Sequence, residues 1–92
     1  MFRLGQAYPN PFNPTTNIEF SIPKSCDVRL EVYDLSGKIV RRLIDGIRYE
    51  PGVYKVTWDG TDDHGNRVAS GVYIYRMTAG NYTAAKKVVL AK

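Results

Sequence analysis

The chain has 92 residues, with 13 Lys and Arg against 9 Asp and Glu, which gives a formal net charge of +4 at pH 7. A chain of this length predicts one domain that hides only about two-thirds of its unfolded surface, so we expect modest stability. Its single cysteine, Cys26, excludes an intrachain disulfide and leaves the redox compartment open. No apolar run approaches the roughly 18 residues of a membrane helix, and the first residues lack the apolar core of a signal peptide.

The excess of positive charge is compatible with a nucleic-acid or anionic partner, but its placement favours a solvated surface. Arg41-Arg42 and Lys86-Lys87 are adjacent pairs. Neighbours on a strand point to opposite faces, so each pair splits its charge instead of building a dedicated patch.

The first predicted element is the segment Tyr8-Pro9-Asn10-Pro11-Phe12-Asn13-Pro14, which follows a linker remnant at residues 1–7. Proline fixes φ near about −65°, so the segment is expected to be extended before it docks. Tyr8 and Phe12 supply two rings as apolar anchors. These features predict a strap over residues 8–14 that closes one end of the domain.

Apolar and polar residues then alternate with the period of two that is typical of strands. Pro23 ends the first run, residues 34–37 form a turn after the second, and Asp45-Gly46 is expected to be the turn that ends the third. No window offers helical spacing for three turns. Short strands separated by turns predict an all-β, antiparallel, immunoglobulin-like sandwich of about seven strands. The clearest runs cover residues 17–22, 28–33, 38–44, 53–58, 72–77 and 82–90.

A repeated Gly-Val-Tyr opens two of these strands, at residues 52–54 and 71–73. Equivalent registers place Trp58 in the core and give Tyr73 the role of a tyrosine corner, whose hydroxyl bonds to the backbone. The alternative is a sugar-stacking platform built from Tyr33, Tyr49, Trp58 and Tyr82. The phase of Trp58 with core residues favours the first interpretation.

An acidic loop at residues 59–67 is the one cluster in the sequence suited to metal chemistry. Asp59, Asp62, Asp63 and Asn66 supply the hard oxygen ligands that calcium takes, and they are weak candidates for a calcium site. Their spacing does not fit the EF-hand template. The same residue types are selected by tight turns, which is the favoured interpretation, and we expect no metal and no other cofactor.

Catalysis is not expected from this sequence. The single histidine lies in the acidic loop, and no nucleophile elbow or phosphate-binding glycine loop occurs. Asp62 and Asp63 are conceivable as an acid/base pair, but adjacent turn residues rarely converge on one substrate.

Several motifs together resemble the type A C-terminal sorting domain of type IX secretion cargo, over residues 4–92. They are the Pro-Asn segment leading into Ile18-Glu19-Phe20, then Val32-Tyr33-Asp34-Leu35-Ser36-Gly37, Trp58-Asp59-Gly60, Ala69-Ser70-Gly71-Val72-Tyr73 and Lys86-Lys87-Val88-Val89-Leu90. The structural signature residues of the resemblance are Pro9, Asn10, Pro11, Phe12, Asn13, Pro14, Gly37, Trp58, Gly71 and Tyr73.

The resemblance implies a seven-stranded sandwich, here residues 8–92, at the C-terminus of a secreted protein from the Bacteroidetes or their relatives. Its expected partners are the outer-membrane translocon, a shuttle protein, a sortase and an N-terminal cargo domain. The cargo would pass through the periplasm to the cell surface or the medium. Recognition is expected chiefly within residues 80–92, at Gly80, Lys86, Lys87, Val88, Val89, Leu90 and Lys92. A terminal strand at a sheet edge would offer unpaired backbone groups to a receptor.

Two other functions stay open. The portion from Trp58 to Tyr73 also resembles the immunoglobulin-like domain of flagellar hook-capping proteins, which implies a structural assembly module. A carbohydrate-binding accessory module of a secreted hydrolase would use an exposed ring such as Tyr33 or Tyr82.

Overall fold

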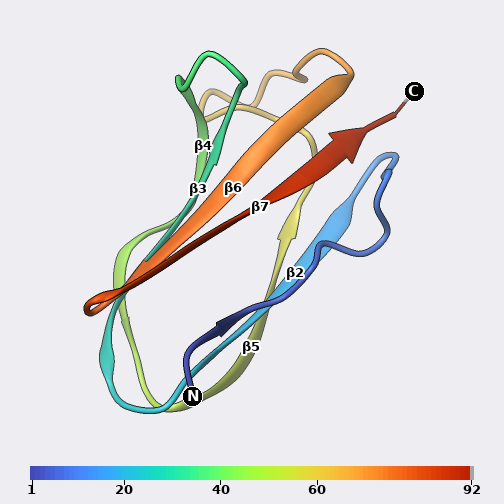
Figure 1. Ribbon diagram of the computed structural model, residues 1–92. Coiled ribbons are helices and arrows are strands. Elements are labelled where there is room, and N and C mark those ends of the chain that lie inside the picture. Colours follow the sequence, from blue (N-terminus) through green and yellow to red (C-terminus); the bar gives the residue numbers. More distant parts are fainter. Residues whose placement is uncertain (92) are drawn as a thin grey trace.

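The computed structural model describes residues 1–91, and it contains seven strands and no helix in that range (Figure 1). Lys92, one of the predicted recognition residues, lies outside the described residues. No helix able to cross a membrane is found within residues 1–91. The strands are β1 (Arg3–Leu4), β2 (Thr16–Ile22), β3 (Cys26–Tyr33), β4 (Ile39–Tyr49), β5 (Gly52–Trp58), β6 (Gly71–Ala79) and β7 (Tyr82–Leu90).

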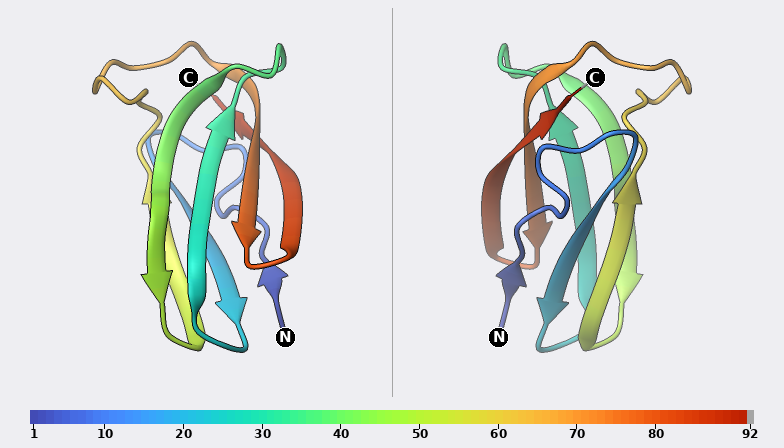
Figure 2. Two further views of the ribbon diagram at one scale, coloured as in Figure 1. Left: turned by 90° about the vertical axis from the view of Figure 1, so that its left-hand side faces the viewer. Right: turned by 90° about the vertical axis from the view of Figure 1, so that its right-hand side faces the viewer.

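The strands form two antiparallel sheets packed face to face, which confirms the predicted immunoglobulin-like sandwich. One sheet has the order β1-β2-β5 and the other the order β4-β3-β6-β7. The left view of Figure 2 runs through the second sheet from β4 to β7, with β2 and β5 behind it. β4 and β7 are therefore the edges of the four-stranded sheet.

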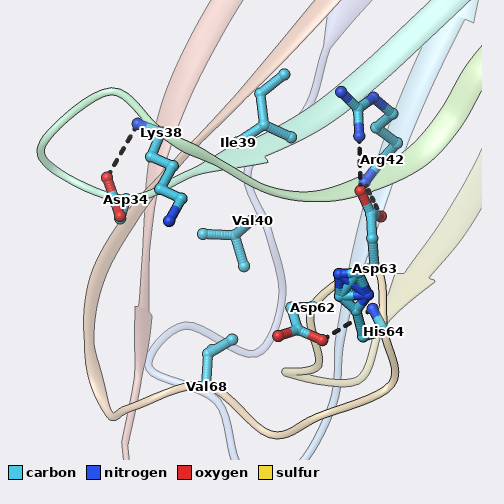
Figure 3. Close-up of a pocket in the computed structure, with 9 residues that line it drawn as sticks. All are labelled: Asp34, Lys38, Ile39, Val40, Arg42, Asp62, Asp63, His64 and Val68. Atoms are coloured by element: carbon cyan, nitrogen blue, oxygen red, sulfur yellow. Dashed lines mark hydrogen bonds and ion pairs between the residues drawn. The ribbon is translucent and has the colours of Figure 1, made fainter.

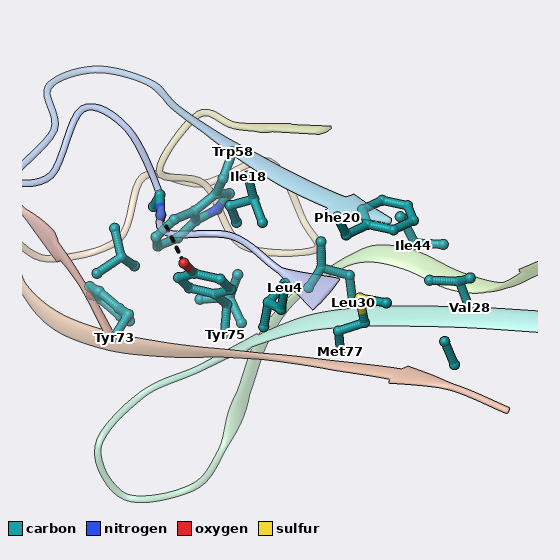
Figure 4. Packing of buried hydrophobic residues seen from close by; sticks show 14 of the residues in the cluster. Leu4, Ile18, Phe20, Val28, Leu30, Ile44, Trp58, Tyr73, Tyr75 and Met77 are labelled. Atoms are coloured by element: carbon teal, nitrogen blue, oxygen red, sulfur yellow. Dashed lines mark hydrogen bonds between the residues drawn. The ribbon is translucent and has the colours of Figure 1, made fainter. Parts of the chain in front are cut away.

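Inward side chains of both sheets make one apolar core, because alternate residues of each strand face the same side. Its largest fully buried side chains include Trp58, Tyr75 and Phe20, which are labelled in Figure 4, and Phe12. The predicted core position of Trp58 is confirmed. Tyr73 donates a hydrogen bond to the carbonyl of Ala69, which confirms the predicted tyrosine corner.

The prediction that Asp45-Gly46 ends the third strand is wrong. β4 continues through both residues to Tyr49, and its pairing with β3 skips Gly46, since Val28 pairs with Ile47 and Arg29 with Asp45. Gly46 has φ of 68° and is the extra residue of a β-bulge. The dipeptide therefore selects the positive φ of a bulge and not a chain reversal.

Residues before the Pro-Asn segment also belong to the sandwich, where the sequence predicted a linker over residues 1–7. Arg3 and Leu4 of β1 pair with Ser21 and Phe20 of β2. The side chains of Leu4 and Ala7 are buried in the core. A strand of two residues is too short to show an alternating pattern, which is why the sequence did not predict it.

Candidate functional site

The predicted recognition strand, β7, lies at an edge of the four-stranded sheet and pairs only with β6 along its ladder. The nine residue pairs from Gly71–Leu90 to Ala79–Tyr82 are consecutive and show no register shift. Lys87 is exposed and Lys86 is partly buried, so the adjacent cations point to opposite faces, as the sequence predicted. Val88 and Leu90 are buried and belong to the core.

The Pro-Asn segment lies against the terminal end of this strand. The backbone N–H of Phe12 donates to the carbonyl of Val89 at 2.9 Å, and the N–H of Ala91 donates to the carbonyl of Phe12 at 2.9 Å. Phe12 and Leu90 form a parallel bridge. Within residues 8–14, Phe12 therefore pairs with the end of β7 as a residue of a neighbouring strand would.

The side chain of Asn10 extends this contact. Its Oδ1 accepts a hydrogen bond from the backbone N–H of Val89 at 2.9 Å, and its Nδ2 donates to the carbonyl of Lys87 at 3.4 Å. Together with Phe12, Asn10 occupies backbone groups that an edge strand would otherwise leave open. We call this set of contacts, between Asn10 and Phe12 on one side and Lys87, Val89 and Ala91 on the other, the clasp.

Two buried rings hold the strap and the residues just before it in place. The ring of Phe12 is 1% exposed and packs against Trp58, with ring centroids 5.2 Å apart. The hydroxyl of Tyr75, whose ring is labelled in Figure 4, accepts from the N–H of Ala7 at 2.8 Å and donates to the carbonyl of Gly5 at 2.7 Å. Phe12 is thus confirmed as an anchor, and Tyr75 is a second anchor that the sequence did not single out.

The prediction for Tyr8 is wrong, because its side chain is 78% exposed. Its backbone N–H and carbonyl both bond to Asn17 at 2.9 Å, and this bridge leaves the ring directed to solvent. The carbonyl of Pro9 accepts from the hydroxyl of Thr16 at 2.7 Å. Bridges and bends, and not one extended strand, describe residues 8–14.

The remaining predicted residues are spread over the molecule. Gly80 lies with Asn81 in the two-residue turn between β6 and β7, with φ of 58°, at the opposite end of β7 from the clasp. Gly37 lies in the turn between β3 and β4, and Gly71 begins β6. Pro11, Asn13 and Pro14 are exposed parts of the strap. The structure therefore brings Lys87, Val89 and Leu90 together with Asn10 and Phe12, but not with Gly80.

The acidic loop lies beside β4, where it lines a cleft (Figure 3). Asp63 donates its backbone N–H to the carbonyl of Val40 at 3.0 Å, and its two carboxylate oxygens accept from the backbone and the guanidinium of Arg42, each at 2.8 Å. Arg41 reaches the carbonyl of Asp62 at 3.3 Å. Both arginines therefore hold this loop against β4 and are not simply solvated.

The other two carboxylates close turns of the loop itself. Asp62 Oδ1 accepts from the backbone N–H groups of His64 and Asn66, each at 2.9 Å. Asp59 Oδ1 accepts from the hydroxyl of Thr61 at 2.5 Å. These hydrogen bonds lower the pKa of both carboxyl groups. This arrangement agrees with the turn interpretation.

Two carboxylates of the acidic loop, those of Asp59 and Asp63, lie near the guanidinium of Arg41, at 3.7 and 4.0 Å. Asp62 bonds within its own turn and Asp63 bonds to Arg42 on β4, so the two do not form an acid/base pair. Within residues 1–91, no group of three or more His, Cys, Asp or Glu side chains is placed to hold a metal ion. The expected absence of a metal stays a prediction, with Asp59, Asp62, Asp63 and Asn66 as the weak calcium candidates of the sequence.

The rings considered for sugar stacking do not form a common surface. Trp58 is buried, Tyr82 stacks on Phe2 with ring centroids 5.2 Å apart, and the guanidinium of Arg76 lies 5.0 Å from the ring centre of Tyr33. Tyr49 packs edge-on against the ring of Phe20 in the core cluster. Each ring is already engaged by the protein.

Comparison with known proteins identifies the family of this sandwich. The sequence profile of the FlgD Ig-like domain matches residues 8–83. The chain belongs to the FlgD Ig-like domain family. Among curated proteins, none matches the sequence.

Two solved structures are similar to this FlgD-like domain. The structure of FlgD from P. aeruginosa is similar with a TM-score of 0.58 and 28% identity, over 83% of this chain and 60% of that one. A second similar structure is PorZ of Porphyromonas gingivalis, described as an essential bacterial surface component of the type IX secretion system. Its TM-score is 0.61, with 20% identity over 99% of this chain and 11% of that one. At that identity PorZ shows the shared fold alone.

Proposed function

We propose that this domain is a non-catalytic export address, which directs an attached cargo protein across the outer membrane by type IX secretion. The cargo passes through the periplasm, and the translocon, a shuttle protein and a sortase are the partners in this proposal. The terminal part of the domain, with the cations of β7, presents the signal.

The observation that carries the proposal is the position of β7. The strand that bears the motif of the resemblance lies at a sheet edge, with Lys87 in solvent and Lys86 partly accessible. An edge strand can be read by another protein, whereas a central strand cannot. The full-length fold similarity to a part of PorZ is compatible with a domain used within the same secretion system.

A reporter fusion tests this function directly. The 92-residue chain is placed behind a signal peptide and a reporter in a host competent for type IX secretion, and reporter is measured in periplasm, surface and medium. We expect export of the fusion, and periplasmic retention when Lys86→Glu and Lys87→Glu are combined. Lys55→Glu on β5, another exposed lysine, is the matched control and should leave export unchanged.

Two results would contradict the proposal: periplasmic retention of the unmodified fusion, or full export of the double variant. Point substitutions are preferable to deleting residues 88–92, because Val88 and Leu90 lie in the core and their loss would destabilise the whole sandwich. The melting temperature of each variant shows that the fold is retained.

A structural assembly module is the second candidate function, and the family match together with the 28% identity to FlgD favours it. Such a module contributes a rigid body to a larger structure and carries no export information. The same fusions separate the two functions, since a purely structural module leaves the location of the reporter unchanged when it is removed.

A further inference from the structure

The two edge strands of the four-stranded sheet, β4 and β7, differ in regularity and in how far other residues cover them. The pairing of β4 with β3 shifts register three times, and the acidic loop bonds to the outer side of β4 at Val40 and Arg42. Bulges and a covering loop are the devices by which proteins protect edge strands from pairing with other chains. The β7 edge has no register shift. The clasp covers it near Leu90, and β1 contacts it toward its start, where the ring of Phe2 stacks on Tyr82.

The clasp also reveals which backbone groups of β7 face outward. In an antiparallel ladder, a residue that turns its N–H and carbonyl to its neighbour alternates with one that turns them away. Val89 turns both groups to the strap, so the odd-numbered residues of β7 face away from β6. Thr83, Ala85 and Lys87 belong to this set.

Between the start of β7 and the clasp, most of these outward backbone groups lack hydrogen-bond partners. Within residues 1–91, neither the N–H nor the carbonyl of Thr83 and Ala85 has a hydrogen-bond partner, and the same holds for the N–H of Lys87. The side chains of all three residues are exposed, and two of them are small. A second strand can therefore approach this stretch closely over residues 83–87.

The charged residues of β6 and β7 are all cations. All 9 acidic residues lie at or before Asp63, so neither β6 nor β7 contains a carboxylate. Arg76, exposed on β6, pairs in register with Ala85, and Lys87 pairs with Ile74. The nearby Glu31 accepts the hydroxyl of Tyr33, which in turn accepts from Arg76 at 2.7 Å.

We propose that residues 83–87 of β7 bind an extended, acidic strand of a partner protein, which adds to the sheet edge by backbone hydrogen bonds. Opposite charges on neighbouring strands stabilise such pairing, so a carboxylate of the partner would face Lys87. A second copy of this chain is a poorer occupant, because it would bring the same cations to the same edge. The proposal deepens the export role and rests on it only for the partner's place in a secretion machinery.

Amide exchange measured by NMR on the 92-residue chain tests the open edge first. The amides of Thr83, Ala85 and Lys87 should exchange at least roughly tenfold faster than those of Ala84, Lys86 and Val88, which face β6. Val89 should be protected by Asn10. Equal protection of odd and even residues would overturn the proposal.

The second step adds a probe, a capped eight-residue peptide of alternating valine and glutamate. It should shift the amide signals of residues 83–87 and slow their exchange, whereas the same peptide with lysine in place of glutamate should do neither. Ala85→Pro removes one outward N–H and leaves the ladder to β6 intact, so it should abolish binding, while Ala85→Val retains the amide and should still bind.

If Ala85→Pro does not fold, Lys87→Glu serves instead and should weaken binding of the acidic peptide. Persistent binding in folded Ala85→Pro, absence of signal shifts at millimolar peptide, or a dimer that protects residues 83–87 without peptide would each overturn the proposal. Peptide binding combined with normal export of an Ala85→Pro reporter fusion would support the strand site and contradict its use in export.

Discussion

Asn10 and Asn13 have the same side chain and lie in the same strap, yet they differ in the hydrogen bonds that their side chains form. Asn10 bonds to Val89 and Lys87, whereas Asn13 has no side-chain hydrogen bond within residues 1–91. A short polar side chain placed between prolines can thus substitute for a neighbouring strand at two backbone groups. The asparagines of the motif are not interchangeable.

We expect Asn10→Ala to lower the free energy of unfolding by about 0.5–1.5 kcal/mol, the usual net contribution of such hydrogen bonds. Asn13→Ala is the matched control and should change it by less than about 0.5 kcal/mol. Urea denaturation measures both values, and exchange of the Val89 amide should rise only in Asn10→Ala. Equal effects of the two substitutions would argue against the clasp.

Tyr75 makes a different kind of contribution, because its hydroxyl joins the core to the backbone of Gly5 and Ala7, just before the strap. Burial raises the pKa of this hydroxyl, which is therefore neutral and able to donate at physiological pH. Tyr75→Phe leaves the N–H of Ala7 and the carbonyl of Gly5 without their partner inside the protein.

The expected cost of Tyr75→Phe is about 1–3 kcal/mol, the penalty for leaving buried polar groups unpaired. Tyr8→Phe removes a hydroxyl from an exposed ring and should cost less than about 0.5 kcal/mol. Thermal and urea unfolding check the pair, and a Tyr75→Phe variant as stable as the original would show that water replaces the hydroxyl.

At the scale of elements, β4 shows how an edge strand is kept irregular. Its extra residues bend the strand, and the positive φ of Gly46 is one that a side chain rarely adopts. A Cβ added there would also lie 3.2 Å from Nη2 of Arg29, which forms an ion pair with Asp45.

Gly46→Ala should therefore destabilise the domain by about 1–2 kcal/mol, the cost of a left-handed backbone for an L-residue. Gly46→Asn should cost less, because asparagine tolerates this conformation better although it carries the same Cβ. Urea denaturation gives the free energy of unfolding of both variants, and the difference between them measures the cost of the left-handed backbone conformation. Identical losses would indicate that the contact with Arg29 dominates.

At the scale of the whole molecule, acid should weaken the fold through its turns. Hydrogen bonds from Ser36 and Lys38 lower the pKa of Asp34, and those from Thr61 and Asn66 lower the pKa of Asp59 and Asp62. The unfolded chain therefore binds more protons near the ordinary aspartate pKa of 3.8. The stabilisation is complete above that value and is lost as the pH falls through the lowered folded pKa.

We expect the urea midpoint to be constant from about pH 7 to about pH 5 and to fall steeply below about pH 4. Asp62→Asn should flatten part of this fall, because it removes one of the titrating groups. Asp27→Asn, on the exposed face of β3, is the control. A midpoint that is independent of pH down to about pH 3 would contradict the role of the turns.

Much of the architecture could be predicted from the sequence, because sheet strands leave a local signal. Alternation located β2, β3, β5, β6 and β7, and the paired Gly-Val-Tyr motifs indicated the correct inward direction for Trp58 and Tyr73. Asp45-Gly46 misled because one dipeptide suits both a turn and a bulge. The two differ in whether the chain reverses or stays paired with its neighbour, and that depends on contacts with β3.

The candidate site was predicted in part. The sequence located the terminal strand and the strap separately, but no local pattern connects Asn10 with Val89, which are 79 residues apart. Tyr8 misled for a related reason, since its backbone bridge to Asn17 decides where its ring points. Contacts of this kind are set by the closed fold and leave no periodicity along the chain.

The sequence separation within the clasp has a consequence for synthesis. Asn10 emerges from the ribosome long before Val89, and the two can meet only when nearly the whole domain has been made. Closing so long a loop costs entropy, which is recovered only once the last strand is in place. The domain thus completes its fold only after residue 89 has been made, and a nascent chain that stops short of it displays an unclosed sandwich.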